Sequence, residues 1–377
     1  MRVVIVSRFP KDIDKPRGGV ETATVGLVRS LIGCGIGELH VVTLEKEIRN
    51  GKRERQEGVE VHRLPRSRCP MILDVFCGPS TKRLRSYLKQ LDPDVVHYQE
   101  TWGFGGAGSG FPHVFTVHGF DSKNLAVERR PGWRLRSLLW RLAESRGLKK
   151  QKAIVSIAPY VKRELERLTS AKIYEVWNCL DRRFFELERR EREKIVLFLG
   201  WINPRKNPLI LVEAAARLKR EFPNAKVQLC GEESDRDYAK KIRDAIDRFD
   251  VAEQVQLTGR LSQSEVMERI QDASVLVLPS LQENAPMVIA EAMAAGLPVI
   301  ASDRCGIPDM VTEGVSGFLI DPSDVEGICE KIGVLLRDDR ARIAMGACAK
   351  EQAFRRFHPD AVAEATLKVY ERAITTH

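Results

Sequence analysis

The stretch that decides the fold runs from Val275 to Asp303 and reads VLVLPSLQENAPMVIAEAMAAGLPVIASD. It begins with a short apolar run rich in valine and leucine, the pattern of a strand buried within a parallel sheet. Pro286 fits the first turn of a helix, where a missing N–H group does no harm, and Gly296 suits the end of that helix. A second buried strand follows. The stretch therefore predicts a strand–loop–helix–strand unit.

Two carboxylates frame the predicted helix, with Glu283 in the loop before it and Glu291 within it. The start of a helix binds anions, because its first N–H groups and the positive end of its dipole face outward. We expect this anion site at Asn284, Ala285, Pro286 and Met287. A sugar–diphosphate–nucleoside has the matching layout, with hydroxyl groups on either side of two phosphates. The ordinary alternative is a pair of surface carboxylates on an unremarkable helix.

Apolar strand-like runs alternate with amphipathic helical runs along the whole chain, which predicts parallel α/β structure. A chain of 377 residues exceeds one common-sized core, so we expect two domains. Residues 1–181 form the first, 182–194 a charged linker, 195–357 the second and 358–377 a last helix. The strands expected in the first domain are 3–7, 39–44, 59–64, 94–98, 114–117, 153–157 and 173–177. The apolar runs expected as strands in the second domain lie at 195–200, 226–231, 255–259, 275–280, 298–302 and 317–321.

The composition of the chain indicates its cellular compartment and the kind of partner to expect. The formal net charge of +9 favours anionic partners, namely phosphates, nucleic acid or acidic lipid. No recognised nucleic-acid module is present, so we expect no nucleic-acid partner. The eight scattered cysteines form no Cys-x-x-Cys pair, which predicts reduced thiols without a disulfide framework or a cysteine zinc site. A strand begins directly after Met1, leaving no room for a signal peptide, so we expect a cytoplasmic protein.

Three further motifs follow predicted strands, at the edge where open α/β sheets bind ligands. Gly18 and Gly19 open a helix, where glycine permits close approach of the backbone to phosphate. His118 ends the run FTVH, and GWINPRKNP spans 200–208. The ordinary alternatives are a plain turn, a structural histidine and a solvated basic loop. A glycine-rich stretch at 103–110 predicts a flexible loop that touches an acceptor.

Glu283-x7-Glu291 followed by AEAMAAGLPVIAS resembles the signature of retaining glycosyltransferases of family 4, which have two facing Rossmann-like domains (GT-B type). The resemblance implies an interdomain cleft and a last helix that crosses back to the first domain. It also implies that Glu283 holds the donor sugar and Glu291 the ribose. Gly18 and Gly19 would line the diphosphate site, and His118 would contact the donor sugar.

In the resembled family, the loop at 200–208 supplies an arginine and a lysine that clamp the diphosphate. Lys206 matches the lysine, but Trp201 stands where the arginine directly after the glycine is usual. We expect Arg205 to substitute for it. Gly200 and Gly231 end two strands near the points where family members contact the donor nucleotide.

The implied activity is transfer of a sugar, with retention, from a nucleotide diphosphate to a hydroxyl group on a lipid-linked acceptor or a growing glycan, as in polysaccharide biosynthesis. We expect no cofactor and no metal ion, because Asp-x-Asp pairs at 92–94 and 235–237 do not lie where the donor would. The alternatives are a sugar-nucleotide epimerase, or a nucleotide- or carbohydrate-binding protein of the same fold with a decayed site.

Residues 129–152 are strongly basic and contain four leucines at helical spacing. We expect Leu135, Leu138, Leu139 and Leu142 to pack on the first domain. Trp133, Arg136, Trp140 and Arg141 would then face outward and contact an anionic membrane surface on its cytoplasmic side. The alternative is that the tryptophans pack beneath a neighbouring loop and the charges are merely solvated.

Overall fold

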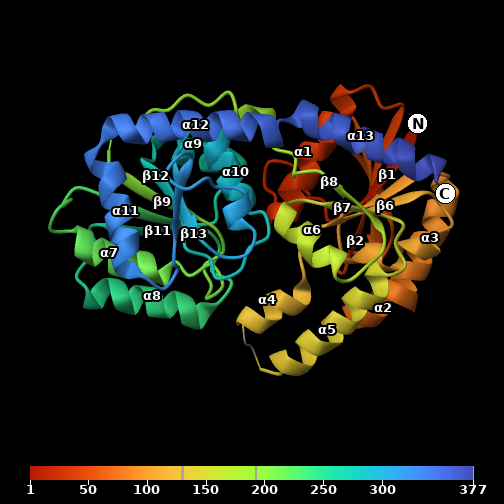
Figure 1. The fold of residues 1–377 in the computed structure, drawn as a ribbon. Helices are drawn as coiled ribbons and strands as arrows, with labels where there is room; N and C mark the ends of the chain where they lie inside the picture. Colours follow the sequence, from red (N-terminus) through yellow and green to blue (C-terminus); the bar gives the residue numbers. More distant parts are fainter. Residues whose placement is uncertain (129–130, 192, 377) are drawn as a thin grey trace. The chain divides into compact units, whose positions relative to one another are not determined.

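The computed structural model describes residues 1–128, 131–191 and 193–376. Its contacts divide the chain into two α/β units (Figure 1). Unit 1 comprises Met1–Asp181 together with the segment from Phe357 onward, and unit 2 comprises Arg182–Arg356. The predicted α/β class is confirmed in both units.

Unit 1 contains an eight-stranded sheet in the order β3-β4-β2-β1-β5-β6-β7-β8, parallel except for the β3–β4 pair. The central strands are almost completely buried, because helices cover both faces of the sheet (Figure 1). All the strands predicted for this half are present, with ends shifted by one or two residues. In chain order they are β1 (Arg2–Val6), β2 (Glu38–Glu45), β3 (Lys52–Gln56), β4 (Val59–Pro65), β5 (Val95–Tyr98), β6 (His113–Val117), β7 (Ala153–Ser156) and β8 (Lys172–Glu175).

Strand β3 is the one that sequence reasoning missed in this unit. It reads KRERQ and pairs antiparallel with β4 at the edge of the sheet. A strand without apolar residues leaves no hydrophobic alternation to detect. Its charges suit the position, because charged edge strands resist pairing with another chain.

The helices of unit 1 include the C-terminal one. The Ser30 hydroxyl on α1 donates to the carbonyl of Pro359, and the hydroxyl of Tyr370 on α13 lies 2.6 Å from His97 Nδ1. His97 is therefore a structural histidine, buried where α13 packs against the sheet. The helices are α1 (Gly19–Gly33), α2 (Met71–Cys77), α3 (Pro79–Leu91), α4 (Asp121–Glu128), α5 (Trp133–Leu148), α6 (Pro159–Glu166) and α13 (Pro359–Thr375), with a 3₁₀ segment η1 (Thr101–Gly108).

The glycine-rich stretch is not the exposed flexible loop that we expected. It forms η1, in which Trp102 and Phe104 are 5% exposed. A Cβ atom at Gly103 would lie 2.2 Å from the ring of Phe115, and one at Gly105 would lie 2.2 Å from the carbonyl oxygen of Val75. These glycines therefore permit close packing rather than motion.

Helix α5 packs on unit 1 through a different face from the one expected. Its four leucines are 43–64% exposed, whereas Ala143, Glu144, Gly147 and Leu148 are buried. Gly147 lies against the ring of Phe104, and Glu144 accepts hydrogen bonds from the Ser122 backbone and hydroxyl. Trp133 and Trp140 are half-buried, and Arg136 and Arg141 are exposed. The predicted packing of the leucines on unit 1 is thus wrong, and 129–130 lie outside the described residues.

Unit 2 contains a six-stranded parallel sheet in the order β11-β10-β9-β12-β13-β14, whose strands were all predicted. They are β9 (Ile195–Leu199), β10 (Lys226–Cys230), β11 (Val255–Gly259), β12 (Val275–Leu278), β13 (Val299–Ser302) and β14 (Gly317–Ile320). Its helices are α7 (Leu209–Leu218), α8 (Arg236–Arg248), α9 (Gln263–Asp272), α10 (Met287–Ala294), α11 (Val325–Arg337) and α12 (Asp339–Phe357), with 3₁₀ turns η2 (Arg182–Phe184) and η3 (Ile307–Asp309). Within the described ranges, no helix is both long and apolar enough to cross a bilayer.

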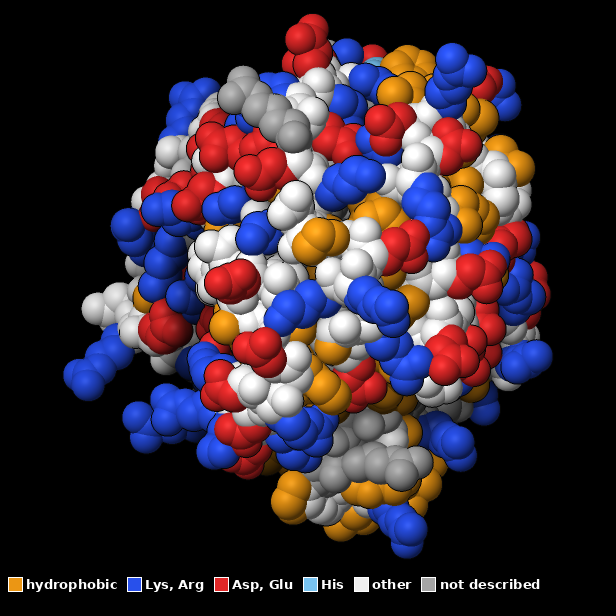
Figure 2. Space-filling model, turned by 90° about the vertical axis from the view of Figure 1, so that its left-hand side faces the viewer, with side chains coloured by type: hydrophobic (Ala, Val, Ile, Leu, Met, Phe, Trp, Pro, Cys, Tyr) orange, Lys and Arg blue, Asp and Glu red, His pale blue; other side chains and the backbone are white. Residues whose placement is uncertain are grey.

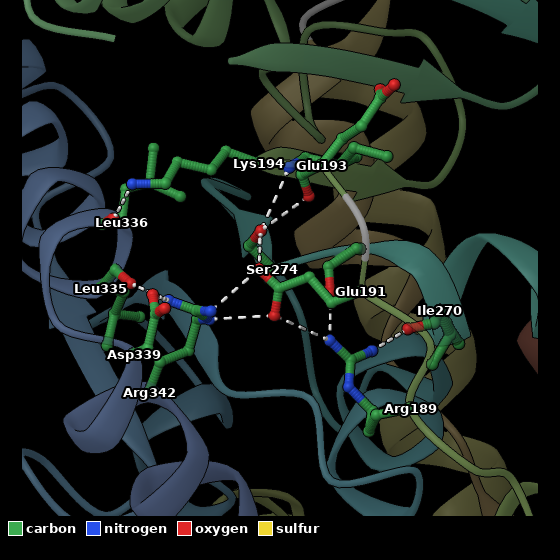
Figure 3. Close-up of polar contacts among 12 residues, drawn as sticks. Arg189, Glu191, Glu193, Lys194, Ile270, Ser274, Leu335, Leu336, Asp339 and Arg342 are labelled. Atoms are coloured by element: carbon green, nitrogen blue, oxygen red, sulfur yellow. Dashed lines mark hydrogen bonds and ion pairs between the residues drawn. The ribbon is translucent and has the colours of Figure 1, made fainter. Parts of the chain in front are cut away.

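The described part of the expected linker belongs to unit 2 and is held there by polar contacts (Figure 3). Arg189 donates to the carbonyl oxygens of Ile270 and Ala273. Glu191 forms an ion pair of 3.0 Å with Arg342 on α12, whose side chain is 8% exposed. Sequence reasoning saw the charges of this segment but not their partners, which lie far away in the chain.

We predict that Arg342→Gln destabilises the protein more than Arg355→Gln, a change of the same kind on the same helix. Arg342 is buried, so its removal takes away the nearer cation of Glu191 and leaves only the weaker contact with Arg189 at 4.0 Å, at a cost of about 3 kcal/mol. Arg355 is 73% exposed and forms an ion pair with Glu351 one turn away, so its loss changes stability by less than about 1 kcal/mol. Differential scanning calorimetry of both variants provides the measurement. Equal melting temperatures would contradict the prediction.

Candidate functional site

Two basic side chains converge on one carboxylate in unit 2. The loop after β9 carries Arg205 and Lys206, and the loop after β12 carries Glu283. Lys206 Nζ lies 2.6 Å from Glu283 Oε1, and Arg205 Nη1 lies 2.7 Å from the same oxygen. The two loops are adjacent because β9 and β12 are neighbouring parallel strands, whose carboxyl ends meet at one edge of the sheet.

The charges of this cluster do not cancel. Burial disfavours the ionised form of Glu283, but Lys206 and Arg205 overcome this effect and hold the pKa of the carboxyl below its ordinary value. Burial lowers the pKa of Lys206, with Glu283 opposing and Arg205 reinforcing the shift. Two cations share one anion, which leaves one positive charge in excess in a nearly buried place. Such a site favours an anion.

The basic loop is held by residues that sequence reasoning missed. The side chain of Asn203, 6% exposed, accepts from the Lys206 backbone N–H and donates to the Ser234 hydroxyl. The backbone N–H of Leu281 donates to the carbonyl of Arg205 at 2.7 Å. Asn203 stands within the same loop as the predicted cations, so a search for polar residues throughout that loop would have found it.

Glycines end three adjacent strands of unit 2. Gly200 donates to the carbonyl of Cys230, and Gly231 donates to the carbonyl of Gly259. A Cβ atom at Gly231 would lie 1.7 Å from the carbonyl oxygen of Gly200. Gly231 is therefore required for the close approach of two loops at the predicted binding edge.

The predicted anion site precedes α10. Pro286 is the N-cap of this helix and has an extended backbone, so it lies just before the helix and not in its first turn as expected. Met287 is the first helical residue. Asn284 is buried and Ala285 half-buried, and Glu291, in the middle of α10, is 6% exposed. The loop is closed by Gly306, whose N–H donates to the Glu283 carbonyl at 3.0 Å.

In unit 1, the predicted residues lie at the carboxyl edge of the other sheet. Gly18 is the N-cap of α1, and Gly19 is its first residue. His118 directly follows β6, and its Nε2 lies 2.6 Å from Gln99 Oε1, just after β5. The amide oxygen accepts, which assigns the ring hydrogen to Nε2.

Burial lowers the pKa of His118 to about 4, and the positive charge of Arg8 acts in the same direction. The imidazole is therefore neutral near pH 7. Arg8 itself forms an ion pair with Glu100, whose side chain is 8% exposed. Sequence reasoning missed Gln99, Glu100 and Arg8, although all three follow predicted strands, as His118 does.

The predicted residues thus form two groups. In unit 2, Arg205, Lys206 and Glu283 are in direct contact, and residues 284–287 and Glu291 belong to the loop and helix that follow. In unit 1, His118 and the Gly18–Gly19 pair share one sheet edge. A paired parallel α/β architecture with basic and glycine-rich loops at the carboxyl edges is typical of enzymes that act on phosphorylated, sugar-bearing ligands.

Two family profiles match consecutive parts of the chain. "Glycosyltransferase Family 4" matches residues 17–184, and "Glycosyl transferases group 1" matches residues 181–352. Between them they include every predicted donor-site residue. The chain belongs to these glycosyltransferases, as its resemblance predicted.

Individual relatives agree with this assignment. The D-inositol 3-phosphate glycosyltransferase of Corynebacterium glutamicum is 32% identical over 50% of this chain and 47% of its own length. This chain spans about half the length of that relative. An uncharacterised glycosyltransferase of Methanocaldococcus jannaschii is 25% identical over 94% of both chains.

Solved structures show the same fold. Sucrose-phosphate synthase from Thermosynechococcus elongatus superposes with a TM-score of 0.84 at 18% identity over the whole of both chains. HepE of Anabaena, in complex with UDP and glucose, superposes with a TM-score of 0.76 at 16% identity over 98% of this chain and 99% of its own.

We predict that Gly306→Ala destabilises unit 2 by about 2 kcal/mol, because forcing extra volume into a packed site costs roughly this much. A Cβ atom at Gly306 would lie 1.7 Å from the carbonyl oxygen of Asn284, so the Glu283–Asn284 backbone would have to move. Gly33→Ala is the control, since nothing lies within 4 Å of its added Cβ atom. Calorimetry on both variants measures the difference, and an unchanged melting temperature for Gly306→Ala would contradict the prediction.

Proposed function

We propose that the protein transfers a hexosyl group from a nucleotide-diphosphate sugar to a hydroxyl acceptor with retention of anomeric configuration. The observation that carries this proposal is the Arg205–Lys206–Glu283 cluster, which has one positive charge in excess. A diphosphate at the start of α10 would be attracted by that excess positive charge and by the positive end of the helix dipole.

The two cations stabilise the leaving diphosphate. Negative charge develops on the leaving phosphate as the sugar departs, and preorganised cations in a poorly hydrated site stabilise that charge most strongly. Lys206 is 8% exposed and the Arg205 side chain 17%, so neither is well solvated. The low pKa of Lys206 rises again when a phosphate joins it, which adds to the binding. These cations replace a metal ion, and no cofactor is required.

The state of Glu283 bears on the stereochemical course. A carboxylate that two cations hold has a lowered pKa and is a weakened nucleophile. This supports front-side attack by the acceptor, whose proton passes to the leaving phosphate, rather than a covalent intermediate on Glu283. Glu283 then holds hydroxyl groups of the donor sugar and stabilises positive charge at the anomeric carbon.

The remaining roles follow the family resemblance. We assign Glu291 to the ribose, and Gly200, Gly231 and residues 284–287 to the donor nucleotide. Gly18 and Gly19 contact the diphosphate, and neutral His118 contacts the donor sugar. UDP and glucose in the structure of HepE support a UDP-sugar as the first donor to test. A panel of UDP-, GDP- and ADP-sugars in thermal-shift experiments identifies the base, since a ligand of the native state raises its melting temperature.

The alternatives are separated by product analysis. An epimerase converts the sugar nucleotide without an acceptor, and a decayed binding protein binds it without turnover. The arrangement of Lys206, Arg205 and Glu283 in direct contact favours a working leaving-group site over a decayed one. Incubation with labelled nucleotide sugars, with and without a glycan or lipid-linked acceptor, distinguishes all three.

We predict that Lys206→Ala lowers turnover by about 100-fold or more, the scale of losing one stabiliser of developing charge. Lys240→Ala is the control, because that lysine is 72% exposed on α8 and forms an ion pair with Asp244 on the same helix. Near-normal turnover in Lys206→Ala would exclude Lys206 from the diphosphate clamp.

We predict that Glu291→Gln weakens donor binding, measured by calorimetry, because a carboxylate that binds the ribose contributes equally to the ground state and the transition state.

We predict that turnover survives excess EDTA, because the proposed clamp uses cationic side chains in place of a metal ion.

We further propose that the enzyme works at the cytoplasmic face of an anionic membrane through α5, which fits a lipid-linked acceptor. The exposed leucines of this helix replace the tryptophans as the apolar contact. Arg134, Arg136, Arg141 and Arg146 on the same helix are exposed. Over most of the face visible in Figure 2, basic and acidic side chains are mixed, but hydrophobic side chains gather at its lower end, at the height of α5 in Figure 1. Leucines flanked by arginines suit an anionic lipid surface.

We predict that replacing Leu135, Leu138, Leu139 and Leu142 together by glutamine abolishes co-sedimentation with anionic liposomes. Replacing Arg136 and Arg141 by glutamine weakens it by about 1 kcal/mol per residue and lowers its sensitivity to salt. Ile343→Gln is the control, because this residue is 68% exposed on α12 in unit 2. Unchanged binding by the leucine variant, or no binding by the parent protein at low salt, would refute the membrane role.

A further inference from the structure

Two neighbouring strands of unit 1 bring together side chains that no part of the proposed reaction uses. The register of β2 and β4 pairs His40 with Glu60 and Val42 with His62. Residues two apart on a strand face the same side of a sheet. His40, Glu60 and His62 therefore share one face, although the two histidines are far apart in the sequence.

The donor atoms of these three side chains form a compact triangle. His40 Nδ1 lies 3.1 Å from His62 Nε2 and 3.5 Å from Glu60 Oε2, and His62 Nε2 lies 3.8 Å from the same oxygen. Ligands at zinc–ligand distances of about 2.0–2.1 Å in a tetrahedron are separated by about 3.3–3.4 Å. The observed separations bracket this value, so the triangle has the dimensions of one face of a zinc tetrahedron.

The outer nitrogens of both imidazoles have partners of the kind that orient metal ligands. The hydroxyl of Tyr87 lies 3.0 Å from His62 Nδ1, and it accepts a hydrogen bond from Arg53 Nε at 2.9 Å. Glu38 Oε2 lies 3.7 Å from His40 Nε2. Once a metal ion is bound, such partners favour the ring hydrogen on the outer nitrogen, which directs the lone pair of the inner nitrogen toward the ion.

Access to the triangle comes from one side. His62 is fully buried, the His40 side chain is 13% exposed and the Glu60 side chain is 56% exposed. A metal ion can therefore enter past Glu60 and keep a water molecule as its fourth ligand. His40 is the third residue of β2, near its amino end, whereas the candidate active-site residues follow the carboxyl ends of strands.

We propose that His40, Glu60 and His62 bind one zinc ion with water as the fourth ligand, and that the ion ties β4 to β2. Two imidazoles and a carboxylate are the ligand set of known three-ligand zinc sites. The 3.1 Å contact between the imidazoles is an N–H···N hydrogen bond when no metal is bound. On binding, the His40 hydrogen moves from Nδ1 to Nε2, the nitrogen on the side of Glu38, so no proton leaves the pair.

The test uses the chain of residues 1–377 without a polyhistidine tag, loaded with zinc chloride and dialysed. Mass spectrometry of the metal content is expected to give about one zinc per chain, with loss in His40→Gln and in Glu60→Gln. Glu60 is exposed, so Glu60→Gln should fold normally, which circular dichroism checks. His358→Gln is the matched control. Zinc should raise the melting temperature of the parent and the control but not of the two variants.

Cobalt substitution separates this site from the exposed thiols of Cys34, Cys77 and Cys348. Cobalt bound to two imidazoles, a carboxylate and water gives visible d–d bands without a thiolate-to-cobalt charge-transfer band. A thiolate band, absence of retained zinc in the parent, or equal zinc content in Glu60→Gln would each overturn the proposal.

Discussion

The candidate donor site depends on one carboxylate shared by two cations. Glu283, Lys206 and Arg205 lie within hydrogen-bonding distance in a place where each would be costly to bury alone. Glu283 makes it possible to keep two cations there, and because it neutralises only one of them, the site retains affinity for an anion. A fully neutral cluster would be more stable but would offer nothing to a diphosphate. In the proposed reaction, the excess charge would bind the diphosphate and the ion pairs would hold the two cations in place.

The surrounding backbone is arranged to hold these three side chains. Asn203 fixes the turn that presents Lys206, and the Leu281 N–H joins the two loops at Arg205. Gly231 and Gly306 allow backbone approaches that a side chain would prevent. Because each loop is bonded to its neighbour, a change in one is transmitted to the cations or to Glu283. Charged side chains need such support, since small displacements change their interaction energy strongly at short range.

Much of the fold was predictable because buried parallel strands have a distinctive signal. Runs such as VLVL at 275–278 are typical of a strand in a covered sheet, and the residues that follow them mark the binding edge. The same logic located Glu283, Lys206 and His118. It did not reveal that Glu283 bonds to both cations, because contacts between loops depend on strand order, which periodicity does not encode. Strand β3 was not predicted for a different reason, because an exposed edge strand needs no hydrophobic pattern.

Helix α5 shows where the reasoning from periodicity fails. A stripe of leucines marks the face that is most favourable to bury, and a helical wheel assumes that the protein's own core buries it. Here small residues make the contact instead, since Gly147 allows the helix to approach Phe104 closely and Glu144 is satisfied by Ser122. Each of these leucines is about half exposed and so forgoes roughly half of the 1.5–3 kcal/mol that full burial of a leucine contributes. Folding alone does not offset that loss, whereas the membrane docking proposed for α5 would recover it.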